Sequence, residues 1–390
     1  MKKYALLLLC CFIAPNLYAI TPMANGGNFG YGTYEYYSYS VQADGTVQTW
    51  GGPYLLPVSI PGLTGVVLTN SGYFVKNDGT VWSLANGSAT SGLVQFGISN
   101  VQKISTSGSH ALALKSDGTV WGWGDNQVGE LGIGQFTYTQ SSPVQAIGLT
   151  GIVDIAASNS NSSEISSYAV MNNGTVWAWG NNYSGQFGNG ATCGVMFCGI
   201  STPTQIFGLS GVKAIASGSN HTVILKNDGS VWVAGGTNGL SFIKVAGLNN
   251  ITAIAAGGSS QGGGDYSLAL KNDGTAWLFQ NSPSPVASQI NGLSNIQSIQ
   301  IGLGGFVFYA VGQNGTVYDW GNVSANGLLG NGTLKGSASP VSVGVAYVSP
   351  PPPYTSTTVP ALSEFGIMIM GALLLLISFV IQKEKDSHLR

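Results

Sequence analysis

The histidines and acids of this 390-residue chain are the residue types that could carry catalysis or hold a metal. His110 and His221 each stand seven residues before an Asx-Gly pair, so they occupy one repeat position, while His388 lies near the C-terminus. We expect the first two to be core residues bonded to backbone. Seven acids in residues 20–350 lie outside the Asx-Gly pairs, and their spacing does not favour acid–base catalysis: Glu35, Asp125, Glu130, Asp154, Glu164, Asp265 and Asp319. We therefore predict no enzyme, no metal site and no cofactor.

Serine and cysteine chemistry is equally sparse. No serine lies in a nucleophile elbow, and no glycine-rich loop followed by lysine is present to bind phosphate. Cys193 and Cys198 lie in Cys-Gly-Val-Met-Phe-Cys, without a nearby histidine or further cysteine. In an exported chain this spacing favours a local disulfide over a metal site. The loop that it closes is short, so we expect modest stabilisation.

The elements that position these residues come from a repeat. An Asx-Gly pair, followed by Thr or Ser, recurs at intervals of 34 to 56 residues: Asp44, Asp78, Asp117, Asn173, Asp228, Asp273 and Asn314. The flanking residues, for example 110–114 and 119–123, alternate with the period of a half-buried strand. The pattern predicts an antiparallel hairpin with a two-residue type I′ turn, in which both central residues have positive φ.

Each predicted hairpin carries aromatic side chains on one face. Six copies have an aromatic residue four positions after the turn Asx: Trp82, Trp121, Trp177, Trp232, Trp277 and Tyr318. Five copies have another aromatic residue two positions later, on the same strand face. A single hairpin cannot bury this stripe, so the repeats must stack. Seven such units predict an all-β, seven-bladed propeller over residues 20–349.

A second pattern, Val/Ile-x-x-Ile, precedes most hairpins, as in residues 101–105 and 152–156. It predicts a further strand in each blade. The first hairpin lacks this pattern upstream, whereas the segment 345–349, Val-Ala-Tyr-Val-Ser, follows the last hairpin. We therefore expect the C-terminal strand to complete the first blade and close the ring, which removes exposed sheet edges.

These motifs resemble the regulator-of-chromosome-condensation repeat. The resemblance is carried by Asp-Gly-Thr-Val, by Asn-x-x-Gly-Gln-Phe-Gly-Asn-Gly at 182–190 with near-copies at 125–134 and 327–332, and by Val/Ile-x-x-Ile-Ala-x-Gly-x-x-His. It covers about residues 25–349 and implies a seven-bladed propeller. A sialidase-type Asp box is superficially similar, but that class needs an arginine cluster, and Arg390 is the chain's sole arginine.

The two ends of the chain predict export and attachment. Residues 1–19 have a basic start and a short apolar core, as in a secretory signal peptide. Residues 350–358 predict an extended Pro/Thr-rich stalk. The apolar run 365–381 is just long enough for a transmembrane helix, and the basic tail to 390 indicates a cytoplasmic end.

The segment 359–366, Val-Pro-Ala-Leu-Ser-Glu-Phe-Gly, resembles a bacterial C-terminal sorting signal with the pattern Ile-Pro-Thr-Leu-Ser-Glu-Trp-Gly. The matching positions are Pro360, Leu362, Ser363, Glu364 and Gly366. The resemblance implies recognition by sorting machinery in the inner membrane of a Gram-negative cell, with the tail kept or removed. A plain anchor helix is the alternative. The expected location is the inner membrane facing the periplasm, or the cell surface after sorting.

The composition of the chain limits the class of molecule that it could bind. Residues 20–350 contain eight lysines and twelve acids, without a basic stripe, which argues against nucleic acid. A tyrosine-rich segment, 25–42, is either blade core or an aromatic patch for a sugar or protein. We expect a binding scaffold whose rim contacts a protein or glycan, with the insertions 125–145 and 181–203 as first candidates. Two alternatives are an exported guanine-nucleotide exchange factor acting on a small GTPase and an exported enzyme inhibitor.

Overall fold

The computed structural model describes residues 23–30, 33–42, 44–85, 92–158, 165–195, 198–259, 264–302, 307–321, 329–333 and 335–346. The predicted signal peptide (1–19), stalk (350–358) and sorting and membrane segment (359–390) lie outside this range. Within the described part of the chain, no helix has both the length and the apolar character needed to cross a bilayer.

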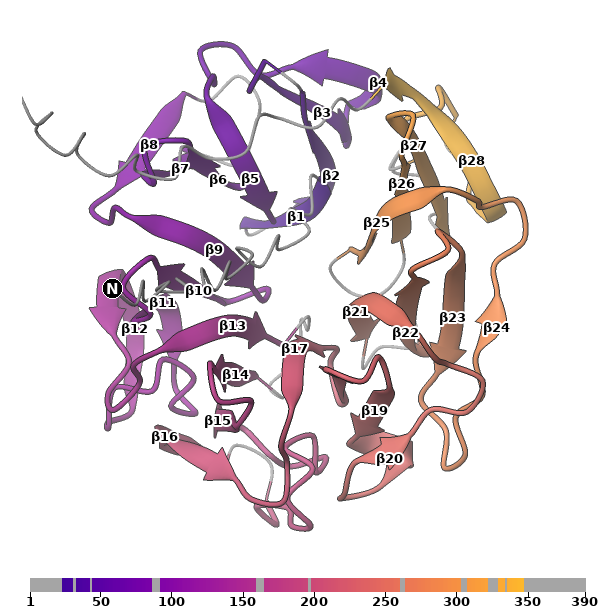
Figure 1. The fold of residues 1–390 in the computed structure, drawn as a ribbon. Coiled ribbons are helices and arrows are strands. Elements are labelled where there is room, and N and C mark those ends of the chain that lie inside the picture. The colour runs from indigo at the N-terminus through magenta and orange to yellow at the C-terminus, as the bar shows by residue number, and fades with distance from the viewer. Residues whose placement is uncertain are drawn as a thin grey trace, which may run out of the picture. The chain divides into compact units, whose positions relative to one another are not determined.

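Seven antiparallel sheets of four strands each surround a common axis (Figure 1). We number them blades 1 to 7 in chain order, each built from four consecutive strands. This arrangement confirms the all-β, seven-bladed propeller predicted from the repeat.

The innermost strands of the blades contact their neighbours around the whole ring, including β1 with β25. They include every Val/Ile-x-x-Ile segment, and almost all Val and Ile side chains of this pattern are buried there. The innermost strands are β1 (Met23–Gly30), β5 (Val66–Asn70), β9 (Val101–Thr106), β13 (Ile152–Ala157), β17 (Val212–Ser217), β21 (Ile251–Ser259) and β25 (Ile296–Ile301).

The predicted hairpins form the second and third strands of the blades. The second strands are β2 (Thr33–Val41), β6 (Tyr73–Lys76), β10 (His110–Lys115), β14 (Ser166–Met171), β18 (Thr222–Lys226), β22 (Gly264–Lys271) and β26 (Val307–Gly312). The third strands are β3 (Val47–Gly51), β7 (Val81–Leu84), β11 (Val120–Asn126), β15 (Val176–Gly180), β19 (Val231–Ala234), β23 (Ala276–Gln280) and β27 (Thr316–Gly321).

The fourth, outermost strands were not predicted individually, because they share no common sequence pattern: β8 is mostly apolar, whereas β12 and β24 are mostly polar. They are β4 (Tyr54–Ser59), β8 (Leu93–Phe96), β12 (Thr137–Gln145), β16 (Ile200–Ile206), β20 (Ile243–Lys244), β24 (Ser288–Gln289) and β28 (Ser337–Ala346). A short 3₁₀ helix, η1 (Gly236–Asn238), precedes β20. Proline lies within the four longest outer strands, at Pro57, Pro143, Pro203 and Pro340. Proline cannot donate to a further strand, so it protects these sheet edges.

The hairpin turns differ from the predicted type I′ geometry. In blade 3, the Gly118 amide donates to the carbonyl of Lys115 (2.9 Å), and the Lys115 amide donates to Thr119 (3.0 Å). Gly118 has a φ of 77°, whereas Asp117 does not adopt positive φ. This is a type I turn followed by a left-handed glycine, the common three-residue hairpin. The prediction was wrong because the Asp side chain accepts hydrogen bonds that hold its own backbone in the ordinary region.

The prediction that the C-terminal strand completes blade 1 was also wrong. Residues 345 and 346 belong to β28, which pairs with β27 in blade 7, and 347–349 lie outside the described residues. Blade 1 obtains its inner strand from β1, which pairs with β2 over its full length. β1 has the sequence Met-Ala-Asn-Gly-Gly-Asn-Phe-Gly, which lacks the apolar pattern of the other inner strands. The sequence therefore gave no signal for it.

The core consists of seven apolar clusters. Between blades 3 and 4, for example, Trp177 and Trp179 of β15 pack with Leu112 and Leu114 of β10. The aromatic residue six positions after the turn is buried wherever present, and the one four positions after it is half-buried. The stripe therefore packs against a neighbouring blade, as predicted, and the structure shows that this neighbour is the preceding blade.

Candidate functional site

The two ends of each blade are chemically different. The Asx-Gly turns lie at one end, which we call the turn face. The connections between third and fourth strands, including both long insertions, lie at the opposite end, which we call the loop face. This follows from the antiparallel order of the strands: His110 pairs with Gly124 at the end of the hairpin farthest from its turn.

The turn face is built from a repeated polar unit. In blade 3, Asp117 Oδ1 accepts from the amide (3.0 Å) and hydroxyl (2.6 Å) of Thr119. The indole of Trp121 donates to the same hydroxyl (3.1 Å), and Lys115 Nζ lies 5.3 Å from the Trp121 ring centroid. These hydrogen bonds, chiefly from the Thr119 side chain, lower the pKa of Asp117. The Lys–Trp contact recurs in blades 2, 5 and 6.

The same turns join neighbouring blades. The carbonyl of Gly118 accepts from the amide of Ile152 at the start of the next inner strand (3.1 Å), and the equivalent bond is present from blade 1 through blade 6. A Cβ on Gly118 would lie 3.0 Å from the backbone of Gly151. The turns of blades 1 to 6 therefore have a structural role, because their contacts pack one blade against the next.

The loop face is closed by clasps, by which we mean loop segments that cover the next blade. In blade 3, the carbonyl of Glu130 accepts from the Trp179 indole (2.7 Å) and the Ser167 hydroxyl (2.7 Å) of blade 4. Asn126 holds the clasp by accepting from the Leu131 amide (3.0 Å) and donating to the Gln135 carbonyl (2.9 Å). Burial raises the pKa of the Glu130 carboxyl.

Blade 4 repeats the clasp with the same residue types. Asn182 Oδ1 accepts from the Phe187 amide (2.9 Å), and the Gly190 amide donates to Leu240 of blade 5 (2.7 Å). The repeated Asn-x-x-Gly sequence is therefore a device that seals one blade to the next. The buried first half of each insertion, predicted as a partner-binding loop, is occupied by this contact.

The second half of each insertion is exposed. Phe136 and Tyr138, at the start of β12, are 56% and 84% exposed. Val195 lies in the second half of the next insertion and is also exposed, and Tyr183 is an exposed residue near the start of that insertion. Cys193 and Cys198 flank Val195 and are joined by a disulfide, with Cα atoms 5.8 Å apart. The loop face of blades 3 and 4 therefore presents large apolar side chains to solvent.

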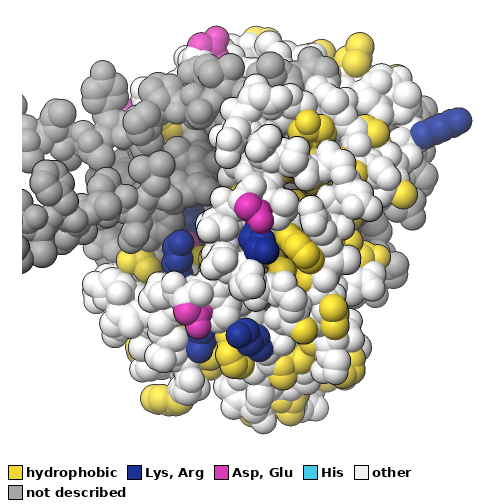
Figure 2. Space-filling model, turned by 45° about the vertical axis from the view of Figure 1, so that its right-hand side comes forward, with side chains coloured by type: hydrophobic (Ala, Val, Ile, Leu, Met, Phe, Trp, Pro, Cys, Tyr) yellow, Lys and Arg dark blue, Asp and Glu magenta, His cyan; other side chains and the backbone are white. Residues whose placement is uncertain are grey.

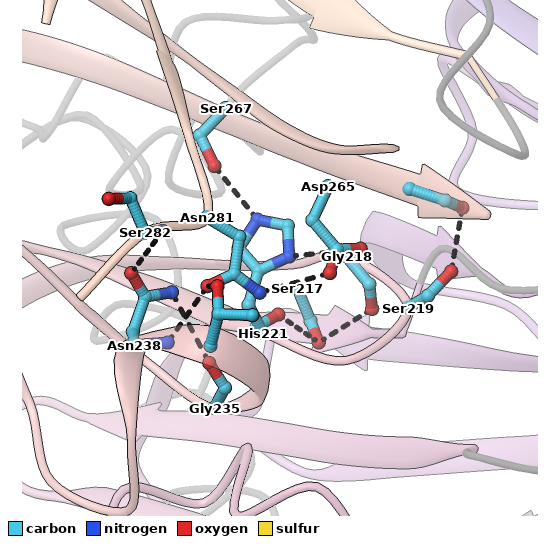
Figure 3. A network of polar contacts seen from close by, with 12 residues as sticks. Ser217, Gly218, Ser219, His221, Gly235, Asn238, Asp265, Ser267, Asn281 and Ser282 are labelled. Atoms are coloured by element: carbon cyan, nitrogen blue, oxygen red, sulfur yellow. Dashed lines mark hydrogen bonds and ion pairs between the residues drawn. The ribbon is translucent and has the colours of Figure 1, made fainter. Parts of the chain in front are cut away.

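A polar network links blades 5 and 6 at the same face (Figure 3). His221 Nε2 lies 2.8 Å from Ser267 Oγ, and Nδ1 lies 3.7 Å from Asp265 Oδ1. Asn281 donates to Asp265 Oδ2 (3.0 Å) and accepts from the Asn238 amide (3.0 Å). Burial alone would raise the pKa of Asp265, but contacts with His221 and Asn281 outweigh it and lower that pKa.

The order Ser267, His221, Asp265 is that of a hydrolase triad, but Ser267 is 1% exposed within β22. His110 makes the same contact with Ser167 (2.8 Å) without any acid, and Ser107 lies 2.8 Å from its Nδ1. Burial lowers the pKa of His110 to about 3. Both histidines therefore connect blades. They bond to serine side chains rather than to backbone alone, which corrects the sequence-based expectation.

The acid facing His221 could have been found by aligning the repeats. Three residues before the histidine, Ser107 is replaced by Gly218; two residues before the partner serine, Ile165 is replaced by Asp265. Compared with His110, His221 therefore lacks the neighbouring serine hydroxyl of its own blade and gains a carboxylate from the next blade. Within the described residues, no group of three or more His, Cys, Asp or Glu side chains could hold a metal.

The surface in Figure 2 carries few charges. Lysines lie singly, several of them beside an acid or an apolar side chain, across a largely uncharged face. Such a surface favours contacts made by apolar and neutral polar groups over electrostatic steering.

Comparison with known proteins identifies the repeat. The family description "Regulator of chromosome condensation (RCC1) repeat" matches residues 117–163 and 173–225, and a second description of this repeat matches 101–130, 152–186 and 212–239. The fold defines a seven-bladed β-propeller. Within it, residues 101–239 match the RCC1 repeat.

Among curated relatives, the probable E3 ubiquitin-protein ligase HERC6 of Homo sapiens is 34% identical over 131 residues, covering 32% of this chain and 12% of that protein. Protein pim1 of Schizosaccharomyces pombe is 29% identical over 164 residues, covering 41% of this chain and 30% of pim1. The chain thus spans less than a third of the length of either relative.

Two solved structures share the fold. Human WBSCR16 superposes with a TM-score of 0.55 at 19% identity, covering 83% of this chain and 82% of that one. Yeast RCC1 (Prp20), solved bound to Kap60, has a TM-score of 0.56 at 20% identity, covering 82% and 74%.

Proposed function

We propose that this RCC1-repeat propeller is an exported, non-enzymatic scaffold that binds a protein through the loop face of blades 3 and 4. The observation that supports the proposal is the exposure of Phe136 and Tyr138. Most aromatic side chains of the repeat are buried between blades, so these two are not needed for packing. Exposed aromatic side chains are the usual anchors of protein interfaces.

Rigidity supports the same proposal. The exposed residues follow directly after the clasp, whose Glu130 and Leu131 are 1% and 0% exposed. A binding segment held on a rigid base loses little conformational entropy when a partner binds. A solved propeller of this type, yeast RCC1 (Prp20), also binds proteins: one structure of it contains Kap60, and a second is described together with its binding to Gsp1p and histones.

Retention of a ligand by the purified full chain tests this function. Envelope and host-surface extracts are passed over the wild-type protein, over the double variant Phe136→Ser/Tyr138→Ser, and over Phe207→Ser. Phe207 is 81% exposed but follows β16 at the turn face, so it is a matched control. We expect a ligand retained by the wild type and the control and lost by the double variant. Equal retention by all three, or by none, would contradict the proposal.

We also propose that residues 1–19 direct export and that 359–390 carry the sorting signal and anchor. The support is the sequence pattern described above. The intact mass of the protein from fractionated cells tests both steps, because removal of either segment changes the mass by a known amount. A full-length mass in the cytoplasmic fraction would contradict the proposal.

A further inference from the structure

The seam between blades 7 and 1 differs from the other six. Every other pair of neighbouring blades is joined by continuous chain, from an outer strand to the next inner strand. Within the described part of the chain, blades 7 and 1 share no strand and no connecting segment. Their junction consists of non-covalent contacts, so it is the place where the ring can separate without unfolding a blade.

Hydrogen bonds and apolar contacts between described residues cross this seam. The Gly332 amide donates to the Leu55 carbonyl (3.0 Å), and Ser38 Oγ lies 2.8 Å from the hydroxyl of Tyr309. The indole of Trp50 packs among apolar residues of blade 7, including Leu329. The same indole donates to Asp319 Oδ2 (3.3 Å). A carboxyl group therefore lies in the middle of the junction.

Asp319 is not a requirement of the repeat. Five positions after the turn Asx, the other blades have residues that do not ionise: Thr49, Ser83, Gly122, Ala178, Val233 and Leu278. An acid at this position occurs in the last blade alone and faces the first blade. The position is fully buried, and Asp319 Oδ1 has no hydrogen-bond partner.

Burial of this group costs much less when it is neutral. Removal of a carboxylate from water is expensive unless several donors or a cation compensate. Asp154, another buried acid, receives the Lys103 ammonium and the amides of Ile155 and Ile215. Among the described residues, Asp319 receives a hydrogen bond from the Trp50 indole alone, and this bond is long. Burial accordingly raises the pKa of Asp319 well above its ordinary value, and Trp50 offsets this slightly.

We propose that the ring closes with Asp319 as the neutral acid, and that ionisation of this carboxyl opens the seam between blades 7 and 1. The carboxylate gains water only when the blades separate, so proton release and opening are linked. Of the groups around it, Trp50 on β3, Ser38 on β2 and Tyr309 on β26 are uncharged at neutral pH. Within the described residues, no cation lies close enough to stabilise the ionised form. This pH-dependent opening of the seam does not depend on the proposed ligand.

The direction of the pH effect on the seam follows from the linkage between proton binding and closure. Because the pKa is raised in the closed ring, the closed ring binds a proton more tightly than the open one. The seam is therefore strongest at a pH below about 4, the ordinary range of an aspartate, and weakens as the pH rises toward the raised value. Each pH unit in this window should shift the opening equilibrium about tenfold.

Hydrogen exchange of the full chain tests the proposal. The amide of Gly332, which donates to the Leu55 carbonyl across the seam, is followed between pH 5 and 9, with its rate divided by that of an unstructured peptide at each pH. We expect this corrected exchange to rise up to about tenfold per pH unit in the wild type. Asp319→Asn keeps an acceptor for Trp50 and cannot ionise, so its corrected exchange should stay flat. Asp265→Asn, which removes an acid between blades 5 and 6, should behave as the wild type.

A flat wild-type profile, or an equal rise in Asp319→Asn, would overturn the proposal. The infrared spectrum of the wild type gives a second, independent readout should the variant not fold. Above the ordinary pKa range of exposed carboxyls it should still contain a protonated-carboxyl band, which disappears when the seam opens as the pH rises. Absence of such a band over the whole pH range would also overturn the proposal.

Discussion

Substitution of single glycines by alanine separates two reasons why the propeller needs glycine: a left-handed backbone and the close approach of a neighbouring chain segment. Gly148, between blades 3 and 4, has a φ of 72° and open space where a Cβ would be. Gly129 in the clasp has a φ of 82°, and its Cβ would lie 2.5 Å from Ser201 Cα in blade 4. Gly199 has no left-handed backbone, but its Cβ would overlap the Val128 carbonyl.

The costs can be estimated from these environments. The left-handed conformation costs a non-glycine residue about 1–2 kcal/mol. Forced displacement of packed neighbours adds about 1–3 kcal/mol. We therefore expect the free energy of unfolding to fall by about 1–2 kcal/mol in Gly148→Ala, about 1–3 kcal/mol in Gly199→Ala, and about 2–5 kcal/mol in Gly129→Ala.

Urea denaturation followed by tryptophan fluorescence measures the three values, because Trp179 lies directly under the clasp. Equal slopes of the transitions are needed so that the midpoints report stability. The reasoning is refuted if Gly129→Ala lowers the free energy of unfolding no more than Gly148→Ala does. The close approach of the clasp to the next blade would then not restrict the side chain at position 129.

Three further outcomes follow from the side-chain contacts. Asp117→Asn should leave stability at neutral pH unchanged, because Asn173 makes the same turn, whereas Asp117→Ala should cost about 0.5–1.5 kcal/mol by urea denaturation. Cys193→Ser should lower the free energy of unfolding by at most about 2 kcal/mol, because the disulfide closes a loop of only six residues. A larger loss would show that the disulfide does more than restrict the unfolded chain. Asp265 has a lowered pKa, so its contribution to stability is present above about pH 4 and is lost as the pH falls further. In Asp265→Asn, the urea midpoint should therefore depend less on pH below 4 than in the wild type. An unchanged profile would contradict this prediction.

The sequence predicted the parts of the fold that the repeat encodes locally. The hairpins, the inner strands with Val/Ile-x-x-Ile and the aromatic stripes were all found, because strand alternation is a property of adjacent residues. The blade number followed from the count of turns. The outer strands were missed individually because sequences such as Thr-Tyr-Thr-Gln-Ser-Ser-Pro-Val-Gln have little alternation.

The remaining features depend on contacts between distant residues. The inner strand of blade 1 is glycine- and asparagine-rich and is specified by pairing with β2, so local pattern could not reveal it. The type of turn was set by the Asp117 side chain rather than by the Asp-Gly pair alone. The seam acid, Asp319, was noted as an acid, but its burial opposite Trp50 requires the closed ring.

Closure of the ring by β1 is the claim on which the account depends most, and the melting temperature of a chain lacking residues 23–30 tests it directly. Without β1, blade 1 loses its inner strand and the contacts of that strand with β5 and β25. The account predicts a melting temperature far below that of the full chain. An unchanged melting temperature would contradict it, because another segment would then have to supply the inner strand of blade 1.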